Sequence, residues 1–317
     1  MCALIGSSTV PLTTNRGTFF MNYTEDASFG QAIDMSFPPR LSPGARLVAI
    51  TLVAWIVIGI FVPWHTLGEG ASDPVSIALV VWGWLLWIAV AIALLVPSPL
   101  SATVVHAISP LAVVCAALAV DAPSLFASLV ALIVLRSAVL MDYMVQGGAY
   151  GQEQRFALRT PVPFMAPAVL AWALLMVSVF GSTFFLATQQ WWIGTPLLAL
   201  AAVALRIIPQ RLHRLSRRWL VIVPSGVVVH DHLVLAETVM SPRNKIASLA
   251  VAETHSESAD FTGGVLGPRL AIELREPDKI VLSKITARTL GTTEALHVRS
   301  FHIAPRRINA ARAALNL

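Results

Sequence analysis

Long apolar stretches alternate with short polar ones over the first two thirds of the chain. A helix must run for about 20 residues to cross roughly 30 Å of hydrocarbon at 1.5 Å per residue. Six stretches are near this length and predict six transmembrane helices, at about residues 45–64, 75–96, 101–120, 123–141, 163–187 and 190–208. Only Asp121, Ala122 and Pro123 separate the third from the fourth, and a charged residue followed by proline favours a tight turn there.

Beyond about residue 215 the apolar positions fall into short runs bounded by turn residues. Trp219–Val223 stops at a Pro-Ser-Gly turn, Leu270–Leu274 alternates apolar with polar, and His297–Ile303 gives a last strand. Pro305 then opens a helix over 305–316. The pattern predicts an α-helical integral membrane protein with a β-rich C-terminal part, divided into a flexible tail (1–42), a six-helix transmembrane domain (43–209) and a β-rich domain (210–317).

Composition supports this division. Hydrophobic residues make up 56% of the 317 residues and charged residues only 12%, whereas soluble chains carry about a quarter. Residues 46–205 hold nine of the 39 Asp, Glu, Lys and Arg residues, and residues 206–317 hold twenty-five. These numbers exclude a disordered chain, a coiled coil and an ordinary soluble enzyme.

Lys and Arg in the short loops predict the orientation, because basic loops stay on the cytoplasmic side. Arg40 and Arg46 precede the first apolar stretch, and the loop 142–162 carries Arg155 and Arg159. The last stretch is followed by a basic cluster without an acid: Arg206, Arg211, Arg214, Arg217 and Arg218. Six crossings with both termini cytoplasmic place every basic loop inside, which predicts a multi-pass plasma-membrane protein.

Two ionisable residues fall inside the predicted membrane helices, where such groups are candidates for function. His106 lies in the third stretch and Arg136 near the end of the fourth. Snorkelling to the interface accounts for Arg136, and a hydrogen bond to a neighbouring helix or a place in a proton path accounts for His106. Every Asp and Glu of this sector lies at or beyond a helix end, which argues against a proton-driven pump and against an intramembrane enzyme.

Basic residues beside the membrane are candidates for binding anions or lipid head groups. The glycine-rich string Gly147–Arg155 offers backbone N–H groups to an anion, and Arg155 and Arg159 could clamp it; a flexible connector explains the same glycines. In the basic cluster, anionic lipid attracts each Arg by about 1 kcal/mol. Enforcing topology explains the cluster as well. The arginines of the basic cluster that are candidates for binding lipid head groups are Arg211, Arg214, Arg217 and Arg218.

The sequence predicts no metal, no cofactor and no nucleic-acid partner. His230-Asp231-His232 combines ligands that suit zinc, but nothing fixes a third or fourth ligand. Cys2 and Cys115 are too few and too far apart for a zinc site or a disulfide framework. A nucleic-acid partner would require a basic face with aromatic platforms, and the sequence shows none.

Two resemblances add to this interpretation. Six or seven short strands followed by one helix over 215–317 resemble the pleckstrin-homology-like domains of bacterial membrane proteins, which implies a bent sheet capped by the helix. The strings at Gly147–Arg155, Leu215–Pro224 and Val229–Glu237 resemble an uncharacterised group of actinobacterial membrane proteins. That group has no assigned activity, so the resemblance implies an architecture and no mechanism.

The resulting hypothesis is a non-catalytic membrane scaffold or regulatory protein. It would present a cytoplasmic β-domain to an unidentified protein partner or to the anionic head groups of the lipid bilayer. A transporter or channel for a small molecule is one alternative, supported by prolines in the predicted helices and by His106. An enzyme that acts on a lipid-linked substrate at Gly147–Arg159 is the other.

Overall fold

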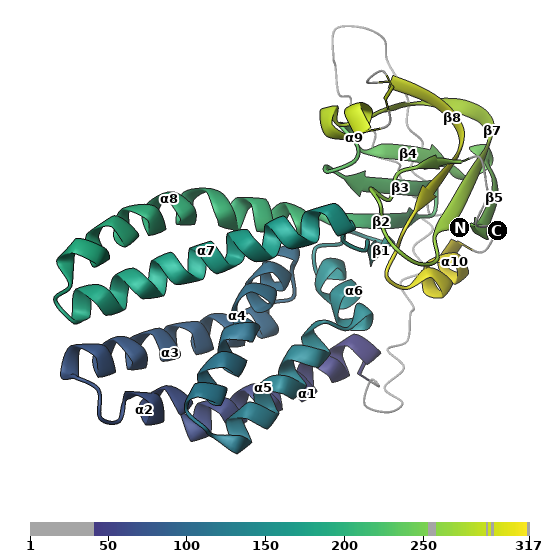
Figure 1. Ribbon diagram of the computed structural model, residues 1–317. Coiled ribbons are helices and arrows are strands. Elements are labelled where there is room, and N and C mark those ends of the chain that lie inside the picture. Colours follow the sequence, from purple (N-terminus) through teal and green to yellow (C-terminus); the bar gives the residue numbers. More distant parts are fainter. Residues whose placement is uncertain (1–40, 253–257, 290, 293–294, 316–317) are drawn as a thin grey trace, which may run out of the picture. The chain divides into compact units, whose positions relative to one another are not determined.

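The computed structural model describes residues 41–252, 258–289, 291–292 and 295–315 (Figure 1). The predicted tail, 1–42, lies outside the described residues except for its last two. Of these, Ser42 caps the first helix, because its Oγ accepts a hydrogen bond of 3.2 Å from the N–H of Ala45. Pro43 follows at the first helical position, where a missing N–H costs nothing.

Long apolar helices form the first part of the described chain. Five helical stretches are long and apolar enough to cross a membrane, and a bent pair of helices makes a sixth candidate. This is compatible with a multi-pass membrane protein, as the hydrophobic pattern predicted. The five are α1 with α2 (Pro43–Phe61 and Pro63–Gly68), α3 (Asp73–Leu95), α4 (Pro99–Leu118), α7 (Val162–Ala187) and α8 (Trp191–Ser216).

The bent pair replaces the straight fourth crossing that the sequence predicted over 123–141. Helix α5 (Ala122–Leu135) and helix α6 (Ala138–Gln146) meet at an angle of 66°. Ser137 sits at the break in an extended conformation, and its Oγ accepts from the N–H of Leu140 at 3.3 Å. An N-cap residue has a non-helical backbone conformation. Ser137 therefore ends α5 at the same point where it caps α6. Helix α5 alone has 14 residues, or about 21 Å at 1.5 Å per residue.

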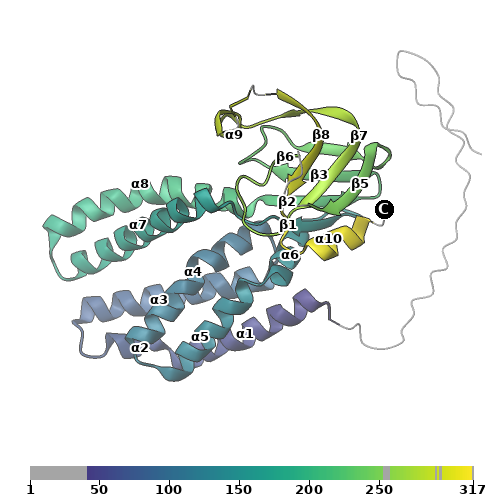
Figure 2. The same ribbon diagram turned by 45° about the vertical axis from the view of Figure 1, so that its right-hand side comes forward.

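Two four-stranded sheets follow. The first has the strand order β1-β2-β3-β4 and the second β5-β7-β8-β6 (Figure 2). The short helix α9 (Lys284–Thr289) precedes β8, and α10 (Ile308–Leu315) closes the described chain. The strands are β1 (Gln154–Ala157), β2 (Arg218–Val223), β3 (Gly226–Asp231), β4 (Val239–Pro242), β5 (Ile246–Val251), β6 (Ala259–Asp260), β7 (Leu270–Val281) and β8 (Ala295–Ile303).

Strand β1 comes from the segment between α6 and α7, which the sequence pattern treated as a connector. It pairs antiparallel with β2, so that Phe156 lies opposite Leu220 and Ala157 opposite Trp219. A strand of four residues carries little periodic signal by itself. Its partner lies more than sixty positions further along the chain, which is why the pattern did not reveal it.

The first sheet is buried on both faces. Leu220 and Ile222 of β2 belong to the core between the two sheets, whereas Trp219 and Val221 belong to the core of the helical part. Successive side chains of a strand point to opposite faces, so one strand contributes to both cores. On the helical side the sheet lies against α6, which appears beside β1 in both views (Figures 1 and 2). Sheets and helices are therefore packed together.

The end of β8 joins the second sheet to the edge of β1. The N–H of Arg159 donates to the carbonyl of Ala304, and the N–H of Arg306 donates to the carbonyl of Ala157, both at 2.8 Å. Leu158 and Pro305 form a bridge between them. This pairing holds Arg306 beside those ends of the long apolar helices that face the sheets.

Candidate functional site

A cavity of about 370 Å³ lies where the helices meet the sheets. Its walls come from α4, the α5–α6 junction, α7, the end of α8, β1 and β2, and from Arg306. We call it the basic cavity, because its charged lining residues are arginines. Those are Arg136, Arg218 and Arg306, with His106 beside them. Most of the remaining lining is apolar and includes Pro110, Val169, Trp172 and Leu212, with a few hydroxyl side chains among them.

His106 closes one wall of the basic cavity by capping a helix end. Its Nε2 lies 3.0 Å from the carbonyl oxygen of Leu135, the last residue of α5. The last carbonyls of a helix lack partners within the helix. Because a carbonyl only accepts, Nε2 carries the hydrogen in this contact. Of the two roles considered from the sequence, the structure contains the hydrogen bond to a neighbouring helix.

Arg136 and Arg306 bring two positive charges to the same side of the basic cavity. Arg136 is the C-terminal cap of α5, and one Nη of Arg306 lies 3.5 Å from the carbonyl oxygen of Arg136. Burial lowers the pKa of Arg306, and the nearby charge of Arg136 acts in the same direction while Asp142 opposes it. Among the described residues that line the basic cavity there is no Asp or Glu. The charges of Arg136 and Arg306 are thus not neutralised by the cavity wall.

Asp142 is the acidic residue nearest to these arginines, and it already has partners. Its Oδ1 accepts from the N–H of Ala157 at 2.8 Å, which ties α6 to β1. Its Oδ2 lies 3.7 Å from an Nη of Arg307, a half-exposed side chain. A single carboxylate therefore faces two arginines, Arg306 and Arg307, and does not reach Arg136 as an ion pair.

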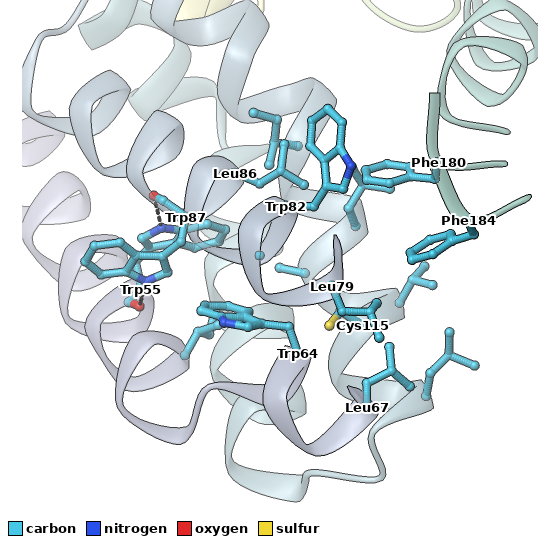
Figure 3. Close-up of a pocket in the computed structure, with 17 residues that line it drawn as sticks. Trp55, Trp64, Leu67, Leu79, Trp82, Leu86, Trp87, Cys115, Phe180 and Phe184 are labelled. Atoms are coloured by element: carbon cyan, nitrogen blue, oxygen red, sulfur yellow. Dashed lines mark hydrogen bonds between the residues drawn. The ribbon is translucent and has the colours of Figure 1, made fainter. Parts of the chain in front are cut away.

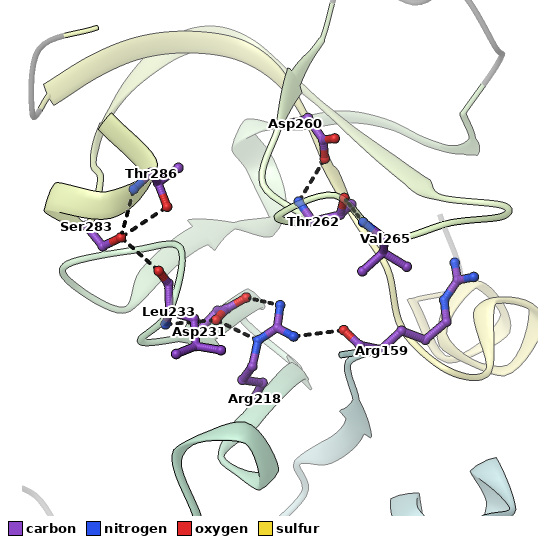
Figure 4. A network of polar contacts seen from close by, with 9 residues as sticks. All are labelled: Arg159, Arg218, Asp231, Leu233, Asp260, Thr262, Val265, Ser283 and Thr286. Carbon is purple, nitrogen blue, oxygen red and sulfur yellow. Dashed lines mark hydrogen bonds and ion pairs between the residues drawn. The ribbon is translucent and has the colours of Figure 1, made fainter. Parts of the chain in front are cut away.

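Arg218 lines the basic cavity, but its guanidinium is bound to residues of the first sheet and of the adjacent loop. Its guanidinium forms two hydrogen bonds with Asp231, of 2.8 and 2.6 Å, and both side chains are 1% exposed (Figure 4). A further Nη donates to the carbonyl of Arg159 at 2.8 Å. Asp231 also accepts from the N–H of Leu233 at 3.1 Å. A buried pair needs such additional bonds to offset desolvation. They engage three of the five N–H donors of Arg218, and Asp231 balances its charge.

The other predicted anion-binding residues are not gathered at one place. Arg155 pairs with Glu153 at 2.6 Å and lies over the ring of Trp219, 5.5 Å from its centroid. Arg159 donates to the carbonyls of Leu266 and Pro268. Three members of the basic cluster are exposed at the end of α8 and do not line the basic cavity: Arg211, Arg214 and Arg217.

The His230-Asp231-His232 string has no metal-site geometry. Asp231 is bound to Arg218, and the ring of His230 stacks on Trp219 with centroids 4.8 Å apart. Burial lowers the pKa of His230 to about 4, with His232 and Arg217 adding to the effect, so the ring is neutral at pH 7. In the described part of the chain no three His, Cys, Asp or Glu residues come close enough to hold a metal ion.

Arg306 is the site residue that sequence reasoning missed. The sequence pattern placed it in the predicted C-terminal helix, 305–316, with no sign of a role. It faces the helices because residues 304–306 pair with the edge of β1, a contact between segments about 150 residues apart. No local pattern carries that information.

Comparisons with protein-family models, with curated proteins and with solved structures find no match for this chain. What can be said about its function therefore depends on its own residues.

Proposed function

We propose that the protein is a non-catalytic, multi-pass plasma-membrane protein that binds the head group of an anionic lipid in the basic cavity. The observation that carries the proposal is the pair Arg136 and Arg306, which line a cavity without a carboxylate among its described lining residues. The cavity lies at the ends of helices that are long and apolar enough to cross a membrane. In this proposal these helix ends lie at the level of the lipid phosphates, just outside the hydrocarbon.

Energetics favour an anion in this place. A charge removed from water is costly unless it is paired, and Arg306 is half-buried. Arginine presents its N–H groups in a planar fork that matches phosphate oxygens. A phosphate between the two guanidinium groups would offset their desolvation and their mutual repulsion. The apolar side chains of Pro110, Val169 and Leu212 would face the glycerol and the first carbons of the acyl chains.

The arrangement suggests a scaffold or regulatory role. A head group in the basic cavity would touch α4, the α5–α6 junction and the segment that joins the two sheets. Lipid binding would therefore stabilise the packing of the sheets against the helices. We further propose that the sheets lie on the cytoplasmic side and form a pleckstrin-homology-like domain for a protein partner. The basic loops, the two four-stranded sheets and the C-terminal helix α10 support this part of the proposal.

The proposal is tested with the full chain in nanodiscs of phosphatidylglycerol or of phosphatidylcholine. A ligand that binds only the folded state raises its stability by RT ln(1 + [L]/Kd). We expect a higher melting temperature in phosphatidylglycerol than in phosphatidylcholine, and we expect Arg136→Gln with Arg306→Gln to abolish that difference. Arg275→Gln, an exposed arginine of β7, is the matched control and should keep it.

Two results would contradict lipid binding at this site. One is a parent protein that melts at the same temperature in both lipids. The other is an equal loss of the lipid effect in Arg275→Gln and in the double variant, which would assign the effect to overall charge.

A transporter for a small molecule is the second candidate, because the basic cavity is lined by His106 and by Pro110 within α4. A proline inside a helix removes a backbone hydrogen bond and permits bending. Flux into proteoliposomes through the parent and through His106→Ala tests the role of His106. Equal flux through both proteins would contradict a role of His106 in transport.

A further inference from the structure

A second cavity lies between the helices, further from the sheets. It has a volume of about 190 Å³ and is lined by α1, α2, α3, α4 and α7 (Figure 3). We call it the aromatic cavity, because six of its lining side chains are aromatic: Trp55, Trp64, Trp82, Trp87, Phe180 and Phe184. On α4 its walls run from Ile108 to Leu118, whereas the basic cavity uses Thr103 to Pro110.

Hydrogen bonds within the chain use the indole N–H groups of three of the four tryptophans in this wall. The Nε1 of the fourth, Trp64, is buried without a partner among the described residues. Trp55 donates to the carbonyl of Trp87 at 2.9 Å, and Trp87 donates to the carbonyl of Trp55 at 2.8 Å. Figure 3 shows this reciprocal pair between α1 and α3. Trp82 donates to the hydroxyl of Thr183 on α7 at 3.3 Å. These three rings therefore present carbon surfaces to the aromatic cavity.

Glycines on the facing helices make room for the rings. A Cβ on Gly83 would lie 2.3 Å from Trp64, and a Cβ on Gly59 would lie 2.9 Å from Trp87. Trp64 is 5% exposed and packs edge to face with Trp84 at 5.2 Å between centroids. Because the rings are fixed by glycines, hydrogen bonds and ring contacts, the cavity exists without a ligand, as ligand sites usually do.

The chemistry of the lining restricts the occupant. No charged residue lines the aromatic cavity in the described chain. Pockets for compact, drug-sized ligands hold about 300–1,000 Å³, so this volume suits a short length of chain better. Its mouth includes Val114 and Leu118 of α4, which are 51% and 65% exposed. These helices are apolar enough to cross a membrane, so we expect the mouth to face hydrocarbon in a bilayer.

We infer that the aromatic cavity binds one hydrocarbon chain of a membrane lipid, on the half of the helices distant from the sheets. The chain would enter past Val114 and Leu118 and lie against the faces of Trp82 and Phe184. Apolar contact with the fixed rings would hold it, with no contribution from the head group. This inference does not depend on lipid phosphate in the basic cavity.

A photoreactive lipid tests the inference directly. The full chain is reconstituted with phosphatidylcholine that carries a diazirine near the end of one acyl chain, and adducts are mapped by mass spectrometry. Phosphatidylcholine is zwitterionic with no net charge, so this readout does not require an anionic lipid in the basic cavity. We expect adducts to concentrate on Trp82, Cys115 and Phe184, in excess over fully lipid-facing positions such as Ile133 (70% exposed) and Val177 (64%).

Filling the cavity provides the second arm of the test. Ala112→Trp and Cys115→Phe each place a larger side chain in the aromatic cavity, and adducts on Trp82 and Phe184 should fall roughly tenfold. Ile133→Trp adds a comparable ring outside it and should leave them unchanged. Adducts in the parent that are no denser in the cavity than at Ile133 would overturn the inference, whether or not the filling variants fold. Cavity adducts that persist in a folded filling variant would also overturn it.

Discussion

The basic cavity and the aromatic cavity share walls from α4 and α7 but differ in how their polar groups are used. In the aromatic cavity the indole N–H groups of Trp55, Trp82 and Trp87 are bound to carbonyl or hydroxyl oxygens of the chain. In the basic cavity the guanidinium groups of Arg136 and Arg306 have no carboxylate among the described lining residues. Hydrogen bonds within the chain satisfy these three N–H groups, and of the described lining tryptophans only Trp64 keeps a buried Nε1 without a partner. The basic cavity, by contrast, has positive charge to offer a ligand.

The contrast shows that the number of arginines in a cavity does not measure its affinity for an anion. Arg218 lines the same cavity as Arg136 and Arg306, yet its charge is balanced by Asp231 at 2.6 Å. Arg155 and Arg159, which the sequence offered as candidates for anion binding, are bound to Glu153 and to backbone carbonyls. The partners of each arginine decide its role.

The largest expected effect concerns the arginine that we assign to structure. Asp231→Asn leaves the charge of Arg218 buried without its counter-ion, and breaking a buried pair costs about 3–5 kcal/mol. The melting temperature should fall by the same large amount in phosphatidylglycerol and in phosphatidylcholine. Asp260→Asn is the control, since its pair with Arg269 is about one-third exposed and should cost about 1 kcal/mol or less. Equal losses in the two variants would refute the distinction.

A smaller effect is expected in the wall of the aromatic cavity. Trp87→Phe keeps a ring on Gly59 but removes the donor to the carbonyl of Trp55. Loss of one buried hydrogen bond costs about 1–3 kcal/mol. Trp84→Phe is the control, because Trp84 lies one helical turn away and its indole N–H has no described hydrogen bond. When the two variants are melted in parallel, Trp84→Phe should lose less stability than Trp87→Phe. A larger loss in Trp84→Phe would show that packing and not the reciprocal bonds holds this wall.

The smallest effect tests the charge balance of the basic cavity. Arg307→Gln removes the half-exposed partner of Asp142, an ion pair of 3.7 Å that contributes about 1 kcal/mol or less. Asp142 then balances Arg306 more fully, so affinity for phosphatidylglycerol should fall by about threefold or less. Lipid retention in native mass spectrometry measures the change. Stronger retention in Arg307→Gln would contradict the proposed balance.

Much of the architecture could be predicted from hydrophobic periodicity, because that pattern is local. The second apolar stretch, predicted at 75–96, is helix α3 at Asp73–Leu95, and the predicted strand Trp219–Val223 is β2 at Arg218–Val223. The prediction of long apolar helices followed by a sheet region is confirmed. The bend between α5 and α6 was missed, since Arg136 and Ser137 interrupt the apolar stretch too briefly to change its average.

Only some residues of the candidate site could be predicted from the sequence. His106 and Arg136 stand out because ionisable residues are rare in apolar stretches. Arg306 does not stand out among the charged residues of the C-terminal part, and it reaches the helices only through the pairing of residues 304–306 with β1. The partners of Arg159 and Arg218 are also set by tertiary contacts. Such contacts have no local signature.

The most direct measurement of the central claim is a cryo-electron microscopy map of the full chain in phosphatidylglycerol nanodiscs. We predict density for a phosphate-sized group in the basic cavity, in contact with the guanidinium groups of both Arg136 and Arg306. The same density should be missing from a map of the Arg136→Gln, Arg306→Gln variant. A well-ordered parent map with an empty basic cavity, and lipid phosphates ordered only around Arg211, Arg214 and Arg217, would contradict the account.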